Sequence, residues 1–105
     1  MIIEGGFRGG KVTYVEIDGV VCSEEEDFNS AKPLSENIQK INDLADGGHF
    51  IVYWSSRGKK DGKNYLNMTM EQLDSWGCKY HKISVGIKPE YDLFISNRAK
   101  KIEEI

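Results

Sequence analysis

The sequence predicts a single α/β domain with a small, mainly parallel sheet of about four strands and no cap domain. Stretches rich in β-branched and aromatic residues alternate with stretches whose apolar residues recur every three or four positions. One of the strand-like stretches, residues 50–54, is apolar throughout, as expected of a strand buried on both faces of a parallel sheet. The length of 105 residues fits one compact domain covering residues 1–105.

The first half of the chain contains a glycine-rich segment, a strand and a helix. Residues 1–10 hold the glycines and are expected to form a flexible arm. Residues 12–17 are predicted to form a strand that ends at a turn signal, Asp18-Gly19. A helix is predicted after Pro33, because apolar residues then recur at helical spacing as far as a glycine pair. These apolar residues are Leu34, Ile38, Ile41, Leu44 and Ala45.

The second half repeats the alternation. After the apolar strand at residues 50–54, a second amphipathic helix is predicted over residues 66–76. A weaker strand at 79–83, a fourth strand at 91–95 and a short terminal helix at 99–105 follow. Strands that alternate with helices favour right-handed crossovers and a parallel sheet. The polar stretch between the first strand and the first helix is too short to form a cap domain.

Composition narrows the classes of partner. The formal net charge of −3 provides no basic excess, which argues against a general nucleic-acid binder. No apolar run reaches membrane-spanning length, so no membrane partner is expected. Cys22 and Cys78 belong to no CxxC pair, and no signal peptide is recognised. We therefore expect a cytoplasmic protein with two free thiols.

Polar residues follow each predicted strand, and these segments should meet at one edge of the sheet. In open parallel sheets, ligands bind outside the carboxyl ends of the strands. The segments are Glu16 to Gly19, Ser55 to Gly58, the loop around Lys88, and Ser96-Asn97. Carboxylates two residues apart can ligate Mg²⁺, attack phosphorus or shuttle a proton. Serine hydroxyls and turn N–H groups can hold phosphoryl oxygens, and a lysine can balance their charge.

In this order, the segments resemble the motifs of the haloacid dehalogenase (HAD) superfamily. The chain is most similar to its small, capless, phosphatase-like members of sugar and capsule biosynthesis. The resemblance runs from Lys11 to Lys101. Residues 12–19 are similar to a strand ending in Asp-x-Asp-Gly-Thr, and residues 51–58 to a strand ending in Ser or Thr. Lys88-Pro89 resembles the third motif, and residues 91–99 the acidic fourth motif.

The resemblance implies a Rossmann-like three-layer sandwich and dependence on Mg²⁺. It places Glu16 at the nucleophile, Asp18 at the general acid/base and Lys88 at the charge-balancing lysine. The same motifs imply which residues bind phosphate and metal. The residues expected to bind phosphate are Gly19, Ser55, Ser56, Arg57 and Lys88, and those expected to bind the metal are Glu16, Asp18, Ser96 and Asn97.

Departures from the pattern fall on the chemistry itself. Glu16 replaces an aspartate, and its extra methylene moves the carboxylate by about 1.5 Å. A misplacement of about 1 Å can cost around 100-fold in rate. Ser96 and Asn97 replace carboxylates, which weakens any Mg²⁺ site because that ion prefers carboxylate oxygens. Together these changes predict a catalytically impaired domain that still binds a phosphorylated small molecule.

Two other functions stay open at this stage. One is an active Mg²⁺-dependent phosphatase, a hydrolase of sugar phosphates or similar metabolites. The other is a structural or interaction domain that keeps only the fold. An open, capless site often gains walls from a neighbouring subunit, so a homo-oligomer is a further alternative.

Overall fold

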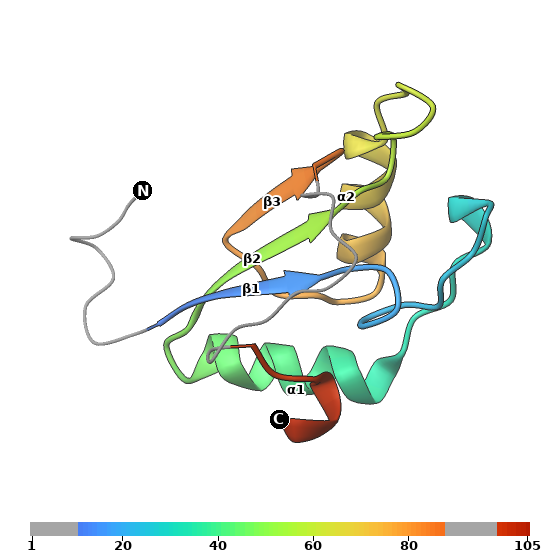
Figure 1. Cartoon of the computed structure of the whole chain (residues 1–105). Coiled ribbons are helices and arrows are strands. Elements are labelled where there is room, and N and C mark those ends of the chain that lie inside the picture. Colours follow the sequence, from blue (N-terminus) through green and yellow to red (C-terminus); the bar gives the residue numbers. More distant parts are fainter. Residues whose placement is uncertain (1–10, 88–98) are drawn as a thin grey trace.

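The computed structural model describes residues 11–87 and 99–105 as a layered α/β unit (Figure 1). Strands and helices alternate along the chain, as the sequence predicts. The elements are β1 (Val12–Glu16), the 3₁₀ turn η1 (Phe28–Ser30), α1 (Ser35–Asp46), β2 (Phe50–Ser55), α2 (Leu66–Ser75), β3 (Lys82–Val85) and the 3₁₀ turn η2 (Ile102–Glu104). None of the helices in these two ranges is long and apolar enough to cross a membrane.

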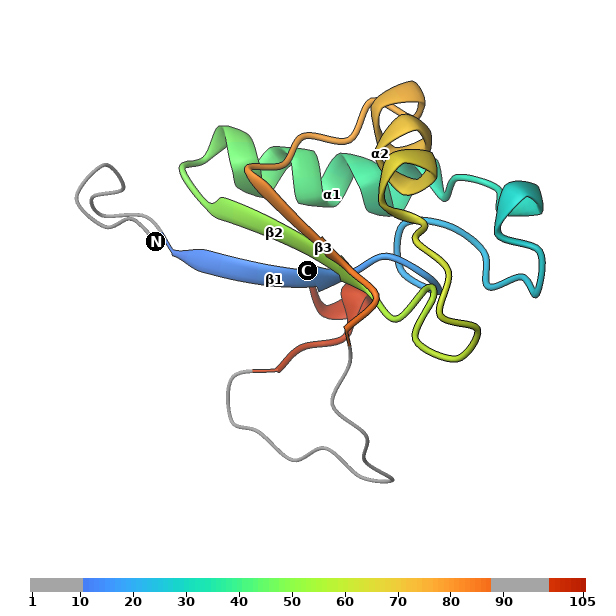
Figure 2. The ribbon, with the colours of Figure 1, turned by 90° about the horizontal axis from the view of Figure 1, so that it is seen from above.

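The three strands found among the described residues form a parallel sheet in the order β1-β2-β3. In the register, Glu16 lies beside Trp54, and Ser55 lies beside Val85. The carboxyl ends of all three strands therefore share one edge. Figure 2 shows α1 and α2 on the same face of the sheet, as right-handed crossovers made in the same direction require. The predicted fourth strand, residues 91–95, and the glycine-rich arm lie outside the described residues.

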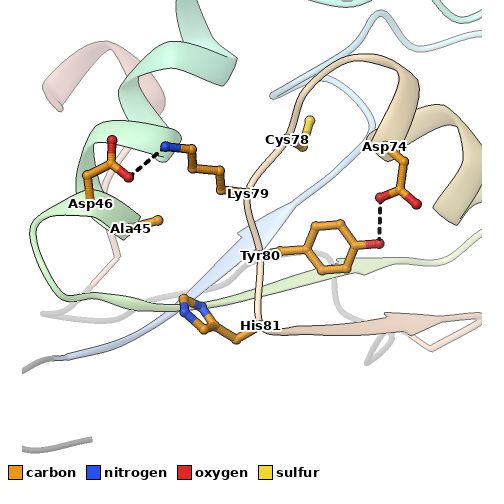
Figure 3. Close-up of a pocket in the computed structure, with 7 residues that line it drawn as sticks. All are labelled: Ala45, Asp46, Asp74, Cys78, Lys79, Tyr80 and His81. Carbon is orange, nitrogen blue, oxygen red and sulfur yellow. Dashed lines mark hydrogen bonds and ion pairs between the residues drawn. The ribbon is translucent and has the colours of Figure 1, made fainter.

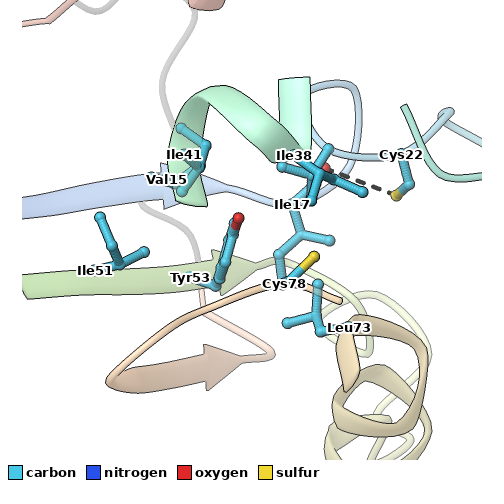
Figure 4. Close-up of a cluster of buried hydrophobic side chains, with 10 residues drawn as sticks. Val15, Ile17, Cys22, Ile38, Ile41, Ile51, Tyr53, Leu73 and Cys78 are labelled. Atoms are coloured by element: carbon cyan, nitrogen blue, oxygen red, sulfur yellow. Dashed lines mark hydrogen bonds between the residues drawn. The ribbon is translucent and has the colours of Figure 1, made fainter. Parts of the chain in front are cut away.

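The core lies between the sheet and the two helices (Figure 4). Side chains alternate along β1, so Val15 points to the helices and is buried, whereas Tyr14 is 67% exposed. The helices cover this face with the apolar stripes that their spacing predicts. The buried cluster includes Val15, Ile17, Ile51 and Tyr53 from the sheet and Ile38, Ile41 and Leu73 from the helices. Each such side chain contributes roughly 1.5–3 kcal/mol by burial.

Strand β3 begins three residues later than the sequence predicts. Residues 79–81 are held instead by contacts to neighbouring elements. The Lys79 N–H donates to Asn42 Oδ1 at 2.8 Å, and the Tyr80 hydroxyl donates to Asp74 at 3.1 Å. Only at Lys82 does the chain enter regular pairing with β2. The strand therefore begins where these side-chain contacts end.

The predicted terminal helix at 99–105 is a single 3₁₀ turn, η2. Seven residues are too few to stabilise an α-helix by propagation of its hydrogen bonds. The turn is fixed locally, because Glu104 accepts a hydrogen bond from the Lys101 N–H at 2.7 Å. It also contacts α1, where Lys40 Nζ donates to the Ile102 carbonyl at 3.3 Å.

Candidate functional site

The end of β1 turns sharply at Asp18-Gly19. The buried Ile17 extends the pairing with β2, since its N–H donates to the Trp54 carbonyl at 2.9 Å. Gly19 then adopts a positive φ of 86°, a conformation that is easy only for glycine. Its N–H donates to the Cys22 carbonyl at 2.8 Å, which closes the turn. The turn leaves the Asp18 carboxylate at the edge where the strands end.

Ser55 joins the ends of all three strands. Its hydroxyl donates to Asp18 Oδ2 at 2.8 Å, and its oxygen accepts the Arg57 N–H at 3.0 Å. Its carbonyl accepts the N–H groups of Gly86 and Ile87 at 2.8 and 3.2 Å. Because Ser55 is fully buried, water does not compete for these hydrogen bonds. Ser55 thus fixes Asp18 relative to the segment that leads from β3 towards residue 88.

Arg57 turns inward and forms a buried ion pair with Asp18. Its Nη2 lies 2.8 Å from Asp18 Oδ1, and its Nε donates to Oδ1 at 3.1 Å and Oδ2 at 3.2 Å. On the other side, Nη1 donates to Thr69 Oγ1 at 3.1 Å and to Gln72 Oε1 at 2.6 Å. The Phe28 ring lies 4.9 Å from the guanidinium carbon. The guanidinium is therefore surrounded by the protein groups of Asp18, Thr69, Gln72 and Phe28.

The Cys22 thiol lies beside this ion pair. Its sulfur is 3.7 Å from Asp18 Oδ1 and 3.7 Å from Arg57 Nη2. Burial raises the pKa of Cys22 to about 11, with a further rise from the Asp18 charge and a partial offset by Arg57. The thiol is consequently protonated at neutral pH. It acts as a small, weakly polar neighbour of the pair rather than as a nucleophile.

The structure brings together several of the predicted site residues. Asp18, Ser55 and Arg57 are in direct contact, and Gly19 forms the adjoining turn. Arg57, however, does not project into solvent, since its side chain is completely buried and its donors are occupied. Glu16 is half-buried at the last position of β1, and Ser56 is half-buried beside Ser55. The predicted residues Lys88, Ser96 and Asn97 lie outside the described residues.

Asp18, one of the predicted magnesium ligands, is surrounded by donors of the protein. Over 11–87 and 99–105, no cluster of three or more histidine, cysteine, aspartate or glutamate residues could hold a metal. Both carboxylate oxygens of Asp18 accept hydrogen bonds from Ser55 or Arg57. A metal at Asp18 would have to displace the guanidinium. The magnesium site as a whole stays a prediction, because its other expected ligands, Ser96 and Asn97, lie outside the described residues.

The sequence analysis missed three residues that shape the site, namely Phe28, Thr69 and Gln72. Thr69 and Gln72 lie three positions apart on α2, so they share a face of that helix. A threonine on the same face as the buried Leu73 was a signal that a polar group lies beneath. Phe28 follows the acidic run and gave no comparable signal. Gln72 also donates from Nε2 to the Phe28 carbonyl at 2.7 Å.

An open hollow of about 540 Å³ adjoins the ends of β2 and β3. It is lined by the loop at 57–66 and by residues 83–87. Lys59, Lys60 and Lys63 of this loop are exposed, and the acidic residues 24–27 are exposed as well. The loop has its own fold, because the Tyr65 hydroxyl donates to Asp61 at 2.6 Å and lowers the pKa of that carboxyl. Asp18, Gly19 and Ser55 are not among the described residues that line this hollow.

A second hollow lies at the opposite end of the sheet (Figure 3). Its polar groups pair with one another. Lys79 forms an ion pair with Asp46 at 2.7 Å, and Tyr80 contacts Asp74. His81 Nδ1 accepts the Ile51 N–H at 3.0 Å, so this ring holds the start of β2. Because it lies away from the carboxyl ends of the strands, this hollow is not the expected place for ligand chemistry.

Comparison with known proteins supports the fold. No protein-family model matches this chain, and no curated protein matches it. The chain is similar to the crystal structure of an MCSG target from Vibrio cholerae, with a TM-score of 0.79 and 24% identity. The match covers 90% of this chain and 85% of that one. At this identity, the similarity shows a shared fold and carries no function.

Proposed function

We propose that this chain is a HAD-like domain, catalytically impaired, that binds a phosphorylated small molecule at the carboxyl ends of its strands. The proposal includes a Rossmann-like layering, with the fourth strand predicted at residues 91–95, and a cytoplasmic location. It is supported by the convergence of Asp18 and Ser55, from adjacent strands, at the edge where such ligands bind. Lys88, the predicted charge-balancing residue, follows directly after Ile87, whose N–H contacts Ser55.

The observation that carries the impaired state is the environment of Asp18. A general acid/base must exchange a proton with the reacting group. The Asp18 carboxylate instead accepts hydrogen bonds from Ser55 and Arg57 and forms a buried ion pair. Both carboxylate oxygens are therefore occupied by donors of the protein itself. Glu16 adds a second impediment, since its longer side chain misplaces a nucleophilic carboxylate by about 1.5 Å.

A phosphatase assay with Mg²⁺ tests the impaired state. The substrates are a panel of sugar phosphates and nucleotides, and the variants are Glu16→Gln and, as a matched control, Glu36→Gln on the exposed start of α1. We expect no turnover above background for any of the three proteins. Turnover that Glu16→Gln abolishes and Glu36→Gln preserves would show an active phosphatase and overturn the proposal.

A titration with inorganic phosphate and hexose phosphates, followed by amide NMR shifts, tests the binding. We expect saturable shifts at Gly19, Ser56 and Gly86, which surround the strand ends, and none at Lys79 in the distant hollow. Absence of any saturable shift would favour a domain that keeps only the fold. Glu16→Gln should leave this binding in place, because Glu16 is not among the residues assigned to phosphate binding.

A further inference from the structure

The Arg57–Asp18 pair is electrically complete without any outside ion. The side chain of Arg57 is 0% exposed and that of Asp18 is 18% exposed. The side-chain groups of Thr69 and Gln72 that accept hydrogen bonds from the guanidinium are neutral. One positive and one negative charge therefore cancel within the protein. No negative charge of Asp18 is left over to attract a second cation.

The geometry leaves a divalent ion no oxygen of Asp18 to bind. Oδ1 accepts hydrogen bonds from Nε and Nη2 of Arg57, and Oδ2 accepts from Nε and from the Ser55 hydroxyl. Mg²⁺ requires ligand oxygens at about 2.0–2.1 Å with nearly octahedral geometry. Such an ion would displace the guanidinium and leave Arg57 buried without a counter-charge, which is strongly unfavourable.

Contacts from two other elements keep the guanidinium in this position. Thr69 and Gln72 on α2 accept from Nη1, and the Phe28 ring covers the guanidinium from the segment that contains η1. Gln72 also binds the Phe28 carbonyl, so α2 and that segment are linked at the same place. A surface arginine could move aside for a metal or a ligand. Arg57 is fixed by Thr69, Gln72 and Phe28 in addition to Asp18.

We propose that the guanidinium of Arg57 is a built-in counter-cation of the strand-end site and takes the place of a divalent metal ion. The fold around Asp18 is then complete without Mg²⁺, and anion binding at this edge needs no metal. The statement about anion binding rests on the proposed function. The statement that Arg57 is the counter-cation of Asp18 does not, because it concerns contacts within the protein. Arg57 is a positioning residue, which acts through Asp18 and Ser55.

Thermal unfolding with chemical rescue tests this role. Arg57→Ala should lower the melting temperature by roughly 10 °C or more, since it leaves Asp18 without its buried partner. Methylguanidinium should restore about 6 °C at ten times its dissociation constant, by binding the vacated position. Methylammonium, which lacks the planar fork, should restore little. As a matched control, Lys79→Ala removes an exposed ion pair and should change the melting temperature by less than about 4 °C. Equal rescue by both cations would overturn the proposal.

Measurements on the unaltered protein remain decisive even where Arg57→Ala fails to fold. Millimolar Mg²⁺ or EDTA should leave its melting temperature unchanged. Mn²⁺ should cause no selective broadening of the amide signals of Asp18, Gly19 and Ser55. Saturable stabilisation by Mg²⁺, or selective broadening at these amides, would show a metal at the site and overturn the inference.

The phosphate titration, repeated with Mg²⁺ and with EDTA, separates the two proposals. Equal affinity in both conditions supports the counter-cation. Phosphate binding that requires Mg²⁺ overturns the counter-cation and keeps the proposed ligand class. Absence of phosphate binding, together with selective rescue by methylguanidinium, rejects the ligand class and supports the counter-cation role of Arg57.

Discussion

Replacing Gln72 by glutamate should release the segment around η1 from α2 while keeping Arg57 in place. Gln72 uses both ends of its amide, because Oε1 accepts from Arg57 Nη1 at 2.6 Å and Nε2 donates to the Phe28 carbonyl at 2.7 Å. Glutamate keeps the acceptor for Arg57 and replaces the donor with a second acceptor. The lost hydrogen bond and the unpaired carbonyl together cost about 2 kcal/mol. A stronger contact to Arg57 offsets part of the loss in global stability.

Hydrogen exchange measures this release directly. The amides of Ser30 and Ala31 are bonded within the η1 segment, at 2.9 and 3.2 Å. If the cost of about 2 kcal/mol falls on local opening, their exchange should accelerate by roughly 30-fold. Gln39→Glu is the matched control, since Gln39 is exposed on α1 and contacts only Asp43 in the described structure. Equal exchange at Ser30 and Ala31 in both variants would refute the role assigned to Gln72.

Two further predictions concern the loop at 57–66 and the buried thiols. Gly58→Ala should lower the free energy of unfolding, measured by urea denaturation, by more than about 3 kcal/mol. The added Cβ would lie 2.1 Å from the Lys63 carbonyl oxygen, and the backbone φ at this position is +95°. Gly62→Ala, with φ of +72° and open space around it, should cost only about 1–2 kcal/mol, and equal losses would contradict the packing argument. Burial raises the pKa of both Cys22 and Cys78 to about 11, above the unfolded value of 9.0. Each thiol therefore adds stability that is complete below pH 9 and is lost as the pH approaches 11, up to about 2–3 kcal/mol each. Urea midpoints should fall between pH 9 and 10.5, and the double variant Cys22→Ala, Cys78→Ala should flatten that slope; an equally steep slope in the variant would contradict the assignment.

The sequence predicts most of the described fold because hydrophobic periodicity is a local signal. Residues 12–17 and 50–54 predict β1 and β2 to within one residue, and the apolar spacing after Pro33 predicts α1. The start of β3 could not be predicted, because it is set by Asn42 and Asp74 on two different helices. Contacts between distant residues override local propensity at this point.

The candidate site also has a part that the sequence predicts and a part that it does not. The rule that ligands bind at the carboxyl ends of parallel strands correctly brings Asp18 and Ser55 together. The direction of Arg57 was not predictable, because it depends on Thr69 and Gln72, more than ten residues later in the chain. An arginine next to lysines suggests a basic surface loop in sequence. Its burial appears only once Thr69 and Gln72 of α2 lie beside it.

The inward position of Arg57 changes what the motif at Asp18 implies. A carboxylate at a strand end predicts proton transfer, yet here it neutralises a buried arginine that α2 holds. Removing either partner would leave the other buried and unpaired, at a cost of about 3–5 kcal/mol. That cost gives Asp18 a role in stability that needs no catalytic requirement. Its presence at the end of β1 is therefore evidence for the fold, and the assay of Glu16→Gln is the experiment that bears on chemistry.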